Sequence, residues 1–260
     1  MRRAVIVSLL FLLVTATALA ARSGVVVLPR PAFPPPVSAV TPSGPTRLAV
    51  VSAHPRAPQL SGSTAASAWM PKRFDGFGLL QVVRQTGVVF LIYGRDGTSA
   101  RLLVGANPRT HAIRYAFDLA SFARPPHIAR GAGDLVTEQV LYAREAGGVV
   151  YVETAHQTYA ESSGGRNAYI AAIGLRRGTT LWRSPALVAN ARTFVLAGNA
   201  LVTGYGFTRE DDWLYLLDRA TGKVRDRLPV PSAPETIAWR GNRLYVRTYD
   251  HDVVAVLRPR

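Results

Sequence analysis

Two acidic clusters are the first places in this chain where residue types and spacing could support chemistry. Asp250-His251-Asp252 places an imidazole between two carboxylates, which suits metal binding or acid–base catalysis. Neighbouring residues of a strand face opposite ways, so such a triple is more typical of a hairpin tip. Glu210-Asp211-Asp212 could bind Ca²⁺ through oxygen ligands, but it lacks the spaced Asp, Asn and Gly pattern of a calcium loop. We interpret it as a solvated turn before Trp213.

The remaining polar motifs match no known catalytic or metal-binding pattern. Ser162-Ser-Gly-Gly165 is a predicted loop because Gly-x-Ser-x-Gly is absent, and Gly204-Tyr-Gly206 precedes no predicted helix that would bind phosphate. The chain has no cysteine, which excludes thiolate catalysis and cysteine-based metal sites. The five histidines are His54, His111, His127, His156 and His251, and no two of them have a metal-binding spacing. We therefore predict no catalytic, metal-binding or cofactor-binding residues, and no cofactor.

The elements that carry these residues are predicted to be short strands. From about Phe74 onward, apolar runs alternate with Gly, Asn and Asp, and no sustained helical period appears. Four runs begin with Gly or Gly-Asn, where a tight hairpin needs a positive φ, and they start at Gly87, Gly148, Gly198 and Gly241. The spacings between the last three of these glycines approach the roughly 40–50 residues of a four-stranded propeller blade.

A second set of strands follows these runs and is apolar on both faces, as strands between packed sheets should be. Its members are Ile113–Asp118, Tyr169–Gly174, Leu214–Asp218 and Val253–Val256. Together the two sets predict an all-β fold, a small β-propeller of about four blades, the first starting near Phe77. The last blade is one strand short, and an unpaired edge invites aggregation. We therefore expect an N-terminal strand, Arg47–Ser52 or Leu79–Arg84, to complete it.

The segment Leu214-Tyr-Leu-Leu-Asp-Arg-Ala-Thr-Gly-Lys-Val224 resembles the pyrroloquinoline-quinone-type propeller repeat. That family writes its blade as strand, Leu-Asp-x-x-Thr-Gly-Lys, strand, and Gly178-Thr-Thr-Leu-Trp182 resembles the end of the same motif. The resemblance implies a propeller, and its non-enzymatic exported members act as envelope-assembly scaffolds. The quinone-dependent enzymes of the family are longer and commonly use a vicinal cysteine pair. Since this chain has no cysteine, the resemblance implies the non-enzymatic branch.

The N-terminal part of the chain indicates export. Residues 1–20 combine a basic start, an apolar run and Ala18-Leu19-Ala20, which together predict a secretory signal peptide; an uncleaved membrane anchor is the alternative. Residues 21–73 form a predicted proline-rich linker with one possible strand, and residues 74–260 form the propeller domain. We therefore expect a secreted, periplasmic or cell-envelope protein with no integral membrane domain unless the N-terminal segment is uncleaved.

The chain is strongly basic, with a formal net charge of +15, and lysine occurs only at Lys72 and Lys223. No basic helix or aromatic-interleaved basic cluster appears, so no specific nucleic-acid binding is expected. The scattered arginines fit either a solvated basic surface or attraction to polyanions such as phosphate-rich envelope polymers.

The fold favours a binding or scaffolding module that contacts a protein or an envelope polymer through a propeller face. Loops 94–101, 155–167 and 204–212 are the candidate surface. Tyr159, Tyr205, Phe207 and Trp213 could line it or pack between blades. The alternatives are a hydrolase or lyase that uses channel carboxylates, and a partial propeller completed by a partner or a second copy.

Overall fold

A computed structural model describes residues 47–55, 66–122, 137–156 and 158–258. The predicted signal peptide, the linker up to residue 46 and His127 lie outside these ranges. The strands are β1 (Arg47–Pro55), β2 (Arg73–Phe74), β3 (Phe77–Gln85), β4 (Val88–Gly94), β5 (Leu102–Ala106), β6 (Ile113–Asp118), β7 (Gln139–Ala146), β8 (Val149–Ala155), β9 (Tyr169–Gly174), β10 (Thr179–Arg183), β11 (Val195–Ala197), β12 (Ala200–Tyr205), β13 (Trp213–Asp218), β14 (Val224–Pro229), β15 (Pro234–Arg240), β16 (Arg243–Thr248) and β17 (His251–Arg258). Single 3₁₀ turns occur at η1 (Ala120–Phe122) and η3 (Ala160–Ser163). No helix in these ranges is long and apolar enough to cross a membrane.

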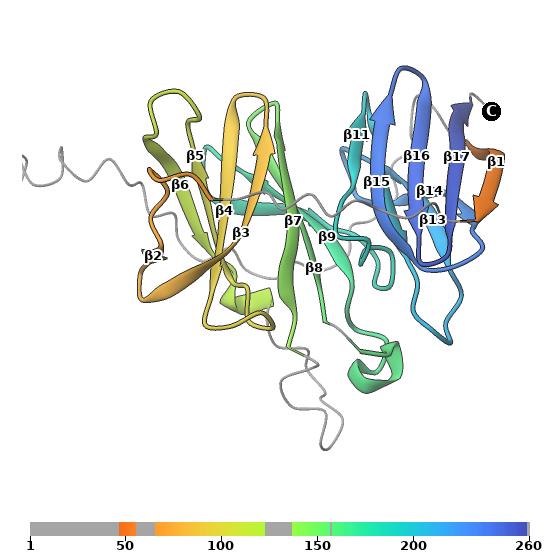
Figure 1. Cartoon of the computed structure of the whole chain (residues 1–260), viewed down its shortest axis with the longest axis horizontal. Coiled ribbons are helices and arrows are strands. Elements are labelled where there is room, and N and C mark those ends of the chain that lie inside the picture. Colours follow the sequence, from red (N-terminus) through yellow and green to blue (C-terminus); the bar gives the residue numbers. More distant parts are fainter. Residues whose placement is uncertain (1–46, 56–65, 123–136, 157, 259–260) are drawn as a thin grey trace, which may run out of the picture.

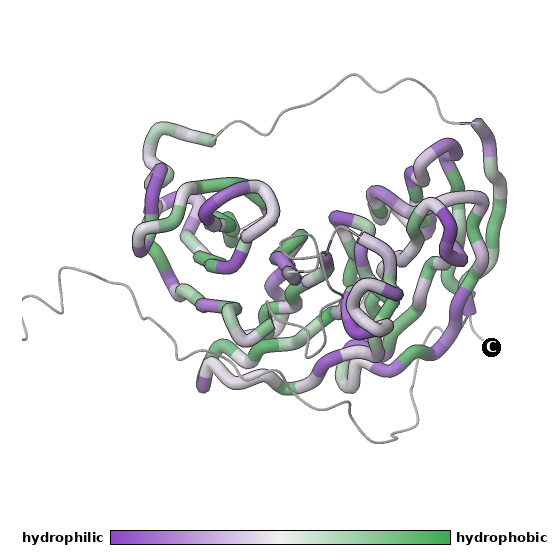
Figure 2. The backbone as a smooth tube through the Cα atoms, turned by 90° about the horizontal axis from the view of Figure 1, so that it is seen from below, coloured by the Kyte–Doolittle hydropathy of each residue, from purple (hydrophilic) through white to green (hydrophobic). Residues whose placement is uncertain are grey.

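The strands form four antiparallel sheets that follow one another along the chain (Figure 1). The first sheet has the order β2-β3-β4-β5-β6, the second β10-β9-β8-β7, the third β11-β12-β13-β14 and the fourth β1-β17-β16-β15. Seen from below, the sheets follow an arc with the first and the fourth at its ends (Figure 2). The chain is therefore an all-β protein with the architecture of a small β-propeller, as the sequence predicts.

Glycines lie in the hairpin turns before β4, β8, β12 and β16, as predicted from the sequence. Gly87, Gly148, Gly198 and Gly241 all have positive φ values, from 60° to 85°. A side chain is disfavoured in this left-handed region, so glycine lets each apolar run turn back on itself.

The fourth sheet is completed by β1, which pairs antiparallel with β17 from Arg47 opposite Arg258 to Pro55 opposite His251. The prediction that Arg47–Ser52 supplies the missing strand is confirmed. The other candidate, Leu79–Arg84, was wrong. It lies within β3 and pairs with β4 in the first sheet, because the hairpin at Gly87 joins these two neighbours.

The core lies between successive sheets. Phe90, Ile92 and Leu103 of the first sheet pack against Val150 and Val152 of the second, and all five are at most 1% exposed. Similar clusters join the second sheet to the third and the third to the fourth. Burying each large aliphatic side chain contributes about 1.5–3 kcal/mol, so these interfaces fix the order of the sheets.

The first sheet carries a further apolar cluster that includes Leu91, Tyr93 and Val104. The segment before β3 packs on this cluster with Trp69, Met70 and Phe74. Tyr93 also donates a hydrogen bond to the Pro71 carbonyl at 2.9 Å. This end of the arc is therefore covered by the chain itself.

Candidate functional site

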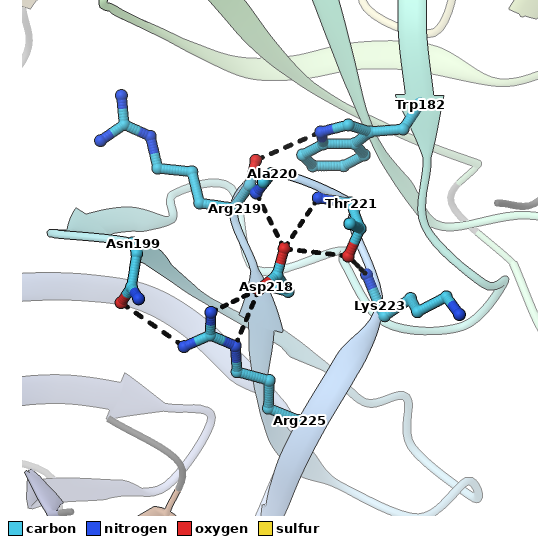
Figure 3. A network of polar contacts seen from close by, with 8 residues as sticks. All are labelled: Trp182, Asn199, Asp218, Arg219, Ala220, Thr221, Lys223 and Arg225. Atoms are coloured by element: carbon cyan, nitrogen blue, oxygen red, sulfur yellow. Dashed lines mark hydrogen bonds and ion pairs between the residues drawn. The ribbon is translucent and has the colours of Figure 1, made fainter. Parts of the chain in front are cut away.

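The repeat motif forms a closed turn between β13 and β14 (Figure 3). One oxygen of Asp218 accepts hydrogen bonds from the Ala220 amide at 3.0 Å, the Thr221 amide at 2.8 Å and the Thr221 hydroxyl at 2.9 Å. Its other oxygen pairs with the Arg225 guanidinium. Burial opposes ionisation of Asp218, but the hydrogen bonds from Arg225 and Thr221 outweigh it and hold its pKa below the usual value.

Trp182 of the second sheet packs onto this turn of the third. Its indole Nε1 donates to the Arg219 carbonyl at 3.2 Å, and a Cβ on Gly222 would lie 2.3 Å from the indole ring. Gly222 also has a φ of +73°, so only glycine fits here without strain. The motif therefore joins two sheets, and every oxygen of Asp218 has a protein partner.

At the opposite end of the sheets, two of the three predicted surface loops meet. The carboxylate of Glu210, in the β12–β13 loop, accepts a hydrogen bond from the Ala160 amide at 2.6 Å and another from the Tyr205 hydroxyl. Tyr159 and Phe207 pack edge to face above this contact, with ring centroids 4.8 Å apart. We call the surface formed by residues 158–167 and 206–212 the loop platform. The loop 94–101 is instead closed by its own Asp96, which accepts bonds from Thr98.

His156 lies directly beneath the loop platform and is 4% exposed. Its Nδ1 accepts a hydrogen bond from the Thr158 amide at 3.2 Å, so the proton of the neutral ring is on Nε2, which has no partner. Burial lowers the pKa of His156 to about 4, although the charge of Glu210 acts in the opposite direction. The imidazole is therefore neutral at physiological pH.

The two acidic clusters lie at turns, and they are close enough for the charge of Asp250 to act on Asp212. Asp250 accepts a hydrogen bond from His251 at 2.7 Å at the tip between β16 and β17, whereas Asp252 pairs with Arg247 at 2.9 Å. Burial, with the charges of Asp211, Asp250 and Glu210, raises the pKa of Asp212 to about 6. Within the described ranges, no group of three or more His, Asp or Glu side chains could hold a metal ion.

The other residues singled out in the sequence lie in strands and turns or in contacts between aromatic and cationic side chains. His54 is exposed on β1, and His111 stacks on Trp69 with centroids 4.4 Å apart. Ser162–Gly165 ends the 3₁₀ turn η3, with Gly164 as its left-handed cap. The Gly206 amide donates to Asn190 at 3.1 Å, and Trp213 lies under the Arg227 guanidinium at 4.3 Å.

Two buried glutamates, Glu138 and Glu153, were not predicted from the sequence. Glu153 on β8 is fully buried, and neither of its carboxylate oxygens has a hydrogen-bond partner. Burial raises the pKa of Glu153 to about 8, and the backbone amide of Ala191 only partly offsets this effect. Glu138 is buried before β7 and accepts a hydrogen bond from Thr154 at 2.9 Å. A glutamate within the apolar run after Gly148 was the available signal for Glu153.

No model of a known protein family matches the chain, and curated protein sequences give no significant match. Solved structures that resemble it include the computationally designed Ika4 protein, with a TM-score of 0.43 and 13% identity, which covers 76% of this chain and 95% of Ika4. BamB from Moraxella catarrhalis has a TM-score of 0.36 and 13% identity over 68% of this chain and 57% of BamB. The quinohemoprotein alcohol dehydrogenase ADHIIG from Pseudomonas putida HK5 has a TM-score of 0.39 and 14% identity over 64% of this chain and 27% of the enzyme. BamB and the dehydrogenase are β-propellers of the pyrroloquinoline-quinone type, and the assignment of the fold here rests on the four sheets themselves.

Proposed function

We propose that this chain is an exported binding and scaffolding module of the bacterial cell envelope that contacts its partner through the loop platform. The observation that carries the proposal is the contact of Glu210 with Ala160 and Tyr205, which ties two loops into one surface. A surface held by hydrogen bonds from the protein itself loses little conformational freedom on binding, which favours recognition. Tyr159, 36% exposed, presents an aromatic side chain on it, and aromatic residues dominate binding hot spots.

Site-specific photo-crosslinking in the native host tests this proposal. A photoreactive phenylalanine analogue replaces Tyr159 in the full chain, and the control places it at Leu181, which is 53% exposed on β10, away from the loop platform. We expect a single crosslinked partner from position 159 and none from 181. Equal crosslinking from both positions, or none from either, would contradict the proposal.

Glu210→Gln adds a second measure of the same surface. The neutral amide is a weaker acceptor for Ala160 and Tyr205, so the loops should separate and the yield from position 159 should fall. The matched control is Glu161→Gln, an exposed glutamate in the same platform. An equal yield in both variants would show that the tie between the loops is not required.

Export is tested by the mass of the mature protein. Cleavage after Ala20 in the envelope fraction is the expected result. Retention of residues 1–20 in the membrane fraction would replace the signal peptide with an anchor.

The alternative, a hydrolase or lyase that uses channel carboxylates, would need two carboxylates or a His–carboxylate pair that converge. The charge of Glu210 acts on His156, and the buried Glu153 has a raised pKa; both observations favour this alternative. His156 and Glu210 already have roles beneath the loop platform, and burial keeps His156 neutral. The binding function is therefore preferred.

A further inference from the structure

The fourth sheet has one face packed on the third sheet and one face toward solvent. Leu48, Ile237, Leu244, Val246 and Val253 point into the core between these sheets. The strands alternate, so the residues between them form the opposite face, which we call the outer face. Thr236, Ala238 and Tyr245 on this face are all exposed.

Four arginines cross the outer face in a row, one from each strand. The antiparallel register places Arg240 of β15 opposite Arg243 of β16, and Arg47 of β1 opposite Arg258 of β17. Arg243 also lies opposite Val256, two residues from Arg258, which joins the two pairs diagonally. All four residues are exposed, and the register places them at the same end of the sheet, next to the β15–β16 hairpin. We call them the arginine row.

Among the described residues, the arginine row has no acidic partner of the kind that Arg225 and Arg247 have. Like charges directly opposite in a sheet destabilise it, and this sheet has two such pairs side by side. Arg247, on the same face, pairs with Asp252, and Arg225 pairs with Asp218. Within the described part of the chain, no ion pair or side-chain hydrogen bond satisfies the guanidinium groups of the row. The row is therefore a concentration of cationic donors open to solvent.

The spacing of the arginine row suits a chain of anions. Adjacent strands lie about 4.8 Å apart, so three spacings give a row of roughly 14 Å. The Cβ atoms of each opposed pair are about 4.5–5.5 Å apart, close enough for two guanidinium groups to contact one phosphate. A hollow of about 350 Å³ adjoins the row, and its lining includes Arg240 and the ion pair of Arg247 with Asp252.

We propose that the arginine row binds a linear polymer that carries phosphate groups. Guanidinium presents a planar fork of donors that matches phosphate oxygens, and a line of charges fits a polymer better than a single ion. Ala49, Ala238, Tyr245 and Val256 adjoin the row on this face. The inference deepens the proposed binding function, but it concerns the outer face and not the loop platform, so each can fail alone.

The test measures binding of long-chain inorganic polyphosphate to the full mature chain at several salt concentrations. If each opposed pair neutralises one phosphate, the row contributes a slope of roughly −1.4 to −1.8 in log K against log salt. Replacing all four arginines by glutamine should then reduce the slope by roughly 1.4 to 1.8. Binding by the wild type should strengthen about 25- to 60-fold more than binding by the variant when the salt is lowered from 1 M to 0.1 M. The matched control replaces Arg95, Arg109, Arg176 and Arg177, which are exposed in turns and loops of the first and second sheets, and it removes the same charge.

Three outcomes would overturn the proposal. The first is an equal loss in the control variant, which would assign the binding to net charge. The second is unchanged binding in the row variant. The third is equally tight binding of polyglutamate of matched charge, which would indicate an acidic protein partner. Thermal unfolding of both variants shows that they are folded, and because the row holds like charges, its variant should melt no lower than the wild type. If no partner crosslinks at position 159 but the arginine row still binds polyphosphate, only the proposed role of the loop platform is refuted.

Discussion

The junction between Trp182 and Gly222 makes a quantitative prediction about stability. Gly222→Ala places a methyl group 2.3 Å from the indole ring and keeps a backbone φ of +73°. The left-handed conformation costs about 1–2 kcal/mol for an alanine. Overpacking against a buried ring costs about 1–3 kcal/mol more. We therefore expect Gly222→Ala to reduce the free energy of unfolding by about 2–5 kcal/mol, a large share of the 5–15 kcal/mol typical of a domain.

Gly241→Ala is the matched control for the backbone contribution. Gly241 has a φ of +61°, and a Cβ there would meet nothing within 4 Å. Its replacement should cost only the strain of about 1–2 kcal/mol. Urea unfolding followed by tryptophan fluorescence and by far-ultraviolet circular dichroism measures both variants on the same chain.

A double variant isolates the contact itself. Trp182→Ala removes the ring and should cost about 3–5 kcal/mol on its own. In that background, Gly222→Ala no longer meets the indole and should cost only its strain, so the two effects should be less than additive by about 1–3 kcal/mol. The reasoning is refuted if Gly222→Ala costs no more than Gly241→Ala, or if the two losses simply add.

Three further predictions concern charge. The pKa of Glu153 is raised to about 8, so the unfolded chain ionises this group from about pH 4.3 upward while the folded chain does not. The free energy of unfolding therefore falls as pH rises from about 4.3 to 8, by about 3 kcal/mol at pH 7, and Glu153→Gln should remove this dependence when urea unfolding is compared at pH 5 and pH 8. The pKa of His156 is lowered to about 4, so its contribution has the opposite sign: stability is lost as pH falls from about 6.5 to 4, and unfolding at these two pH values should differ less in His156→Gln than in the wild type. Arg240→Glu converts a like-charge pair with Arg243 into an opposite-charge pair, so the melting temperature should rise by the equivalent of about 0.2–1 kcal/mol at low salt, and a rise that persists in 1 M salt would contradict the electrostatic reason.

Local features of the fold were predictable from the sequence because each depends on a few neighbouring residues. Gly87 and Gly241 mark hairpins through their own backbone requirement, and the turn at Asp218 closes on residues within seven positions of it. The loop platform was predicted only as separate loops. Its tie joins Ala160 to Glu210, which are 50 positions apart, and no local pattern reveals such a contact. Both residues lie in loops predicted from the sequence, but their contact depends on how the second and third sheets pack.

The arginine row shows why the charge of this chain could not be interpreted from spacing alone. Arg47 and Arg258 lie near opposite ends of the described chain, and only the pairing of β1 with β17 places them side by side. An irregularity between Val50 and Ser52 also shifts the register, so that counting residues from Pro55 opposite His251 would misplace the pair. Protection of the sheet edge explains a charge on β1, because edge strands often carry cations against aggregation. It does not explain Arg243 and Arg258, which lie on the two internal strands, where an opposed like charge only weakens the sheet. The same strand that closes the fourth sheet therefore also completes the row, and an anionic ligand gives these internal arginines a function that edge protection does not.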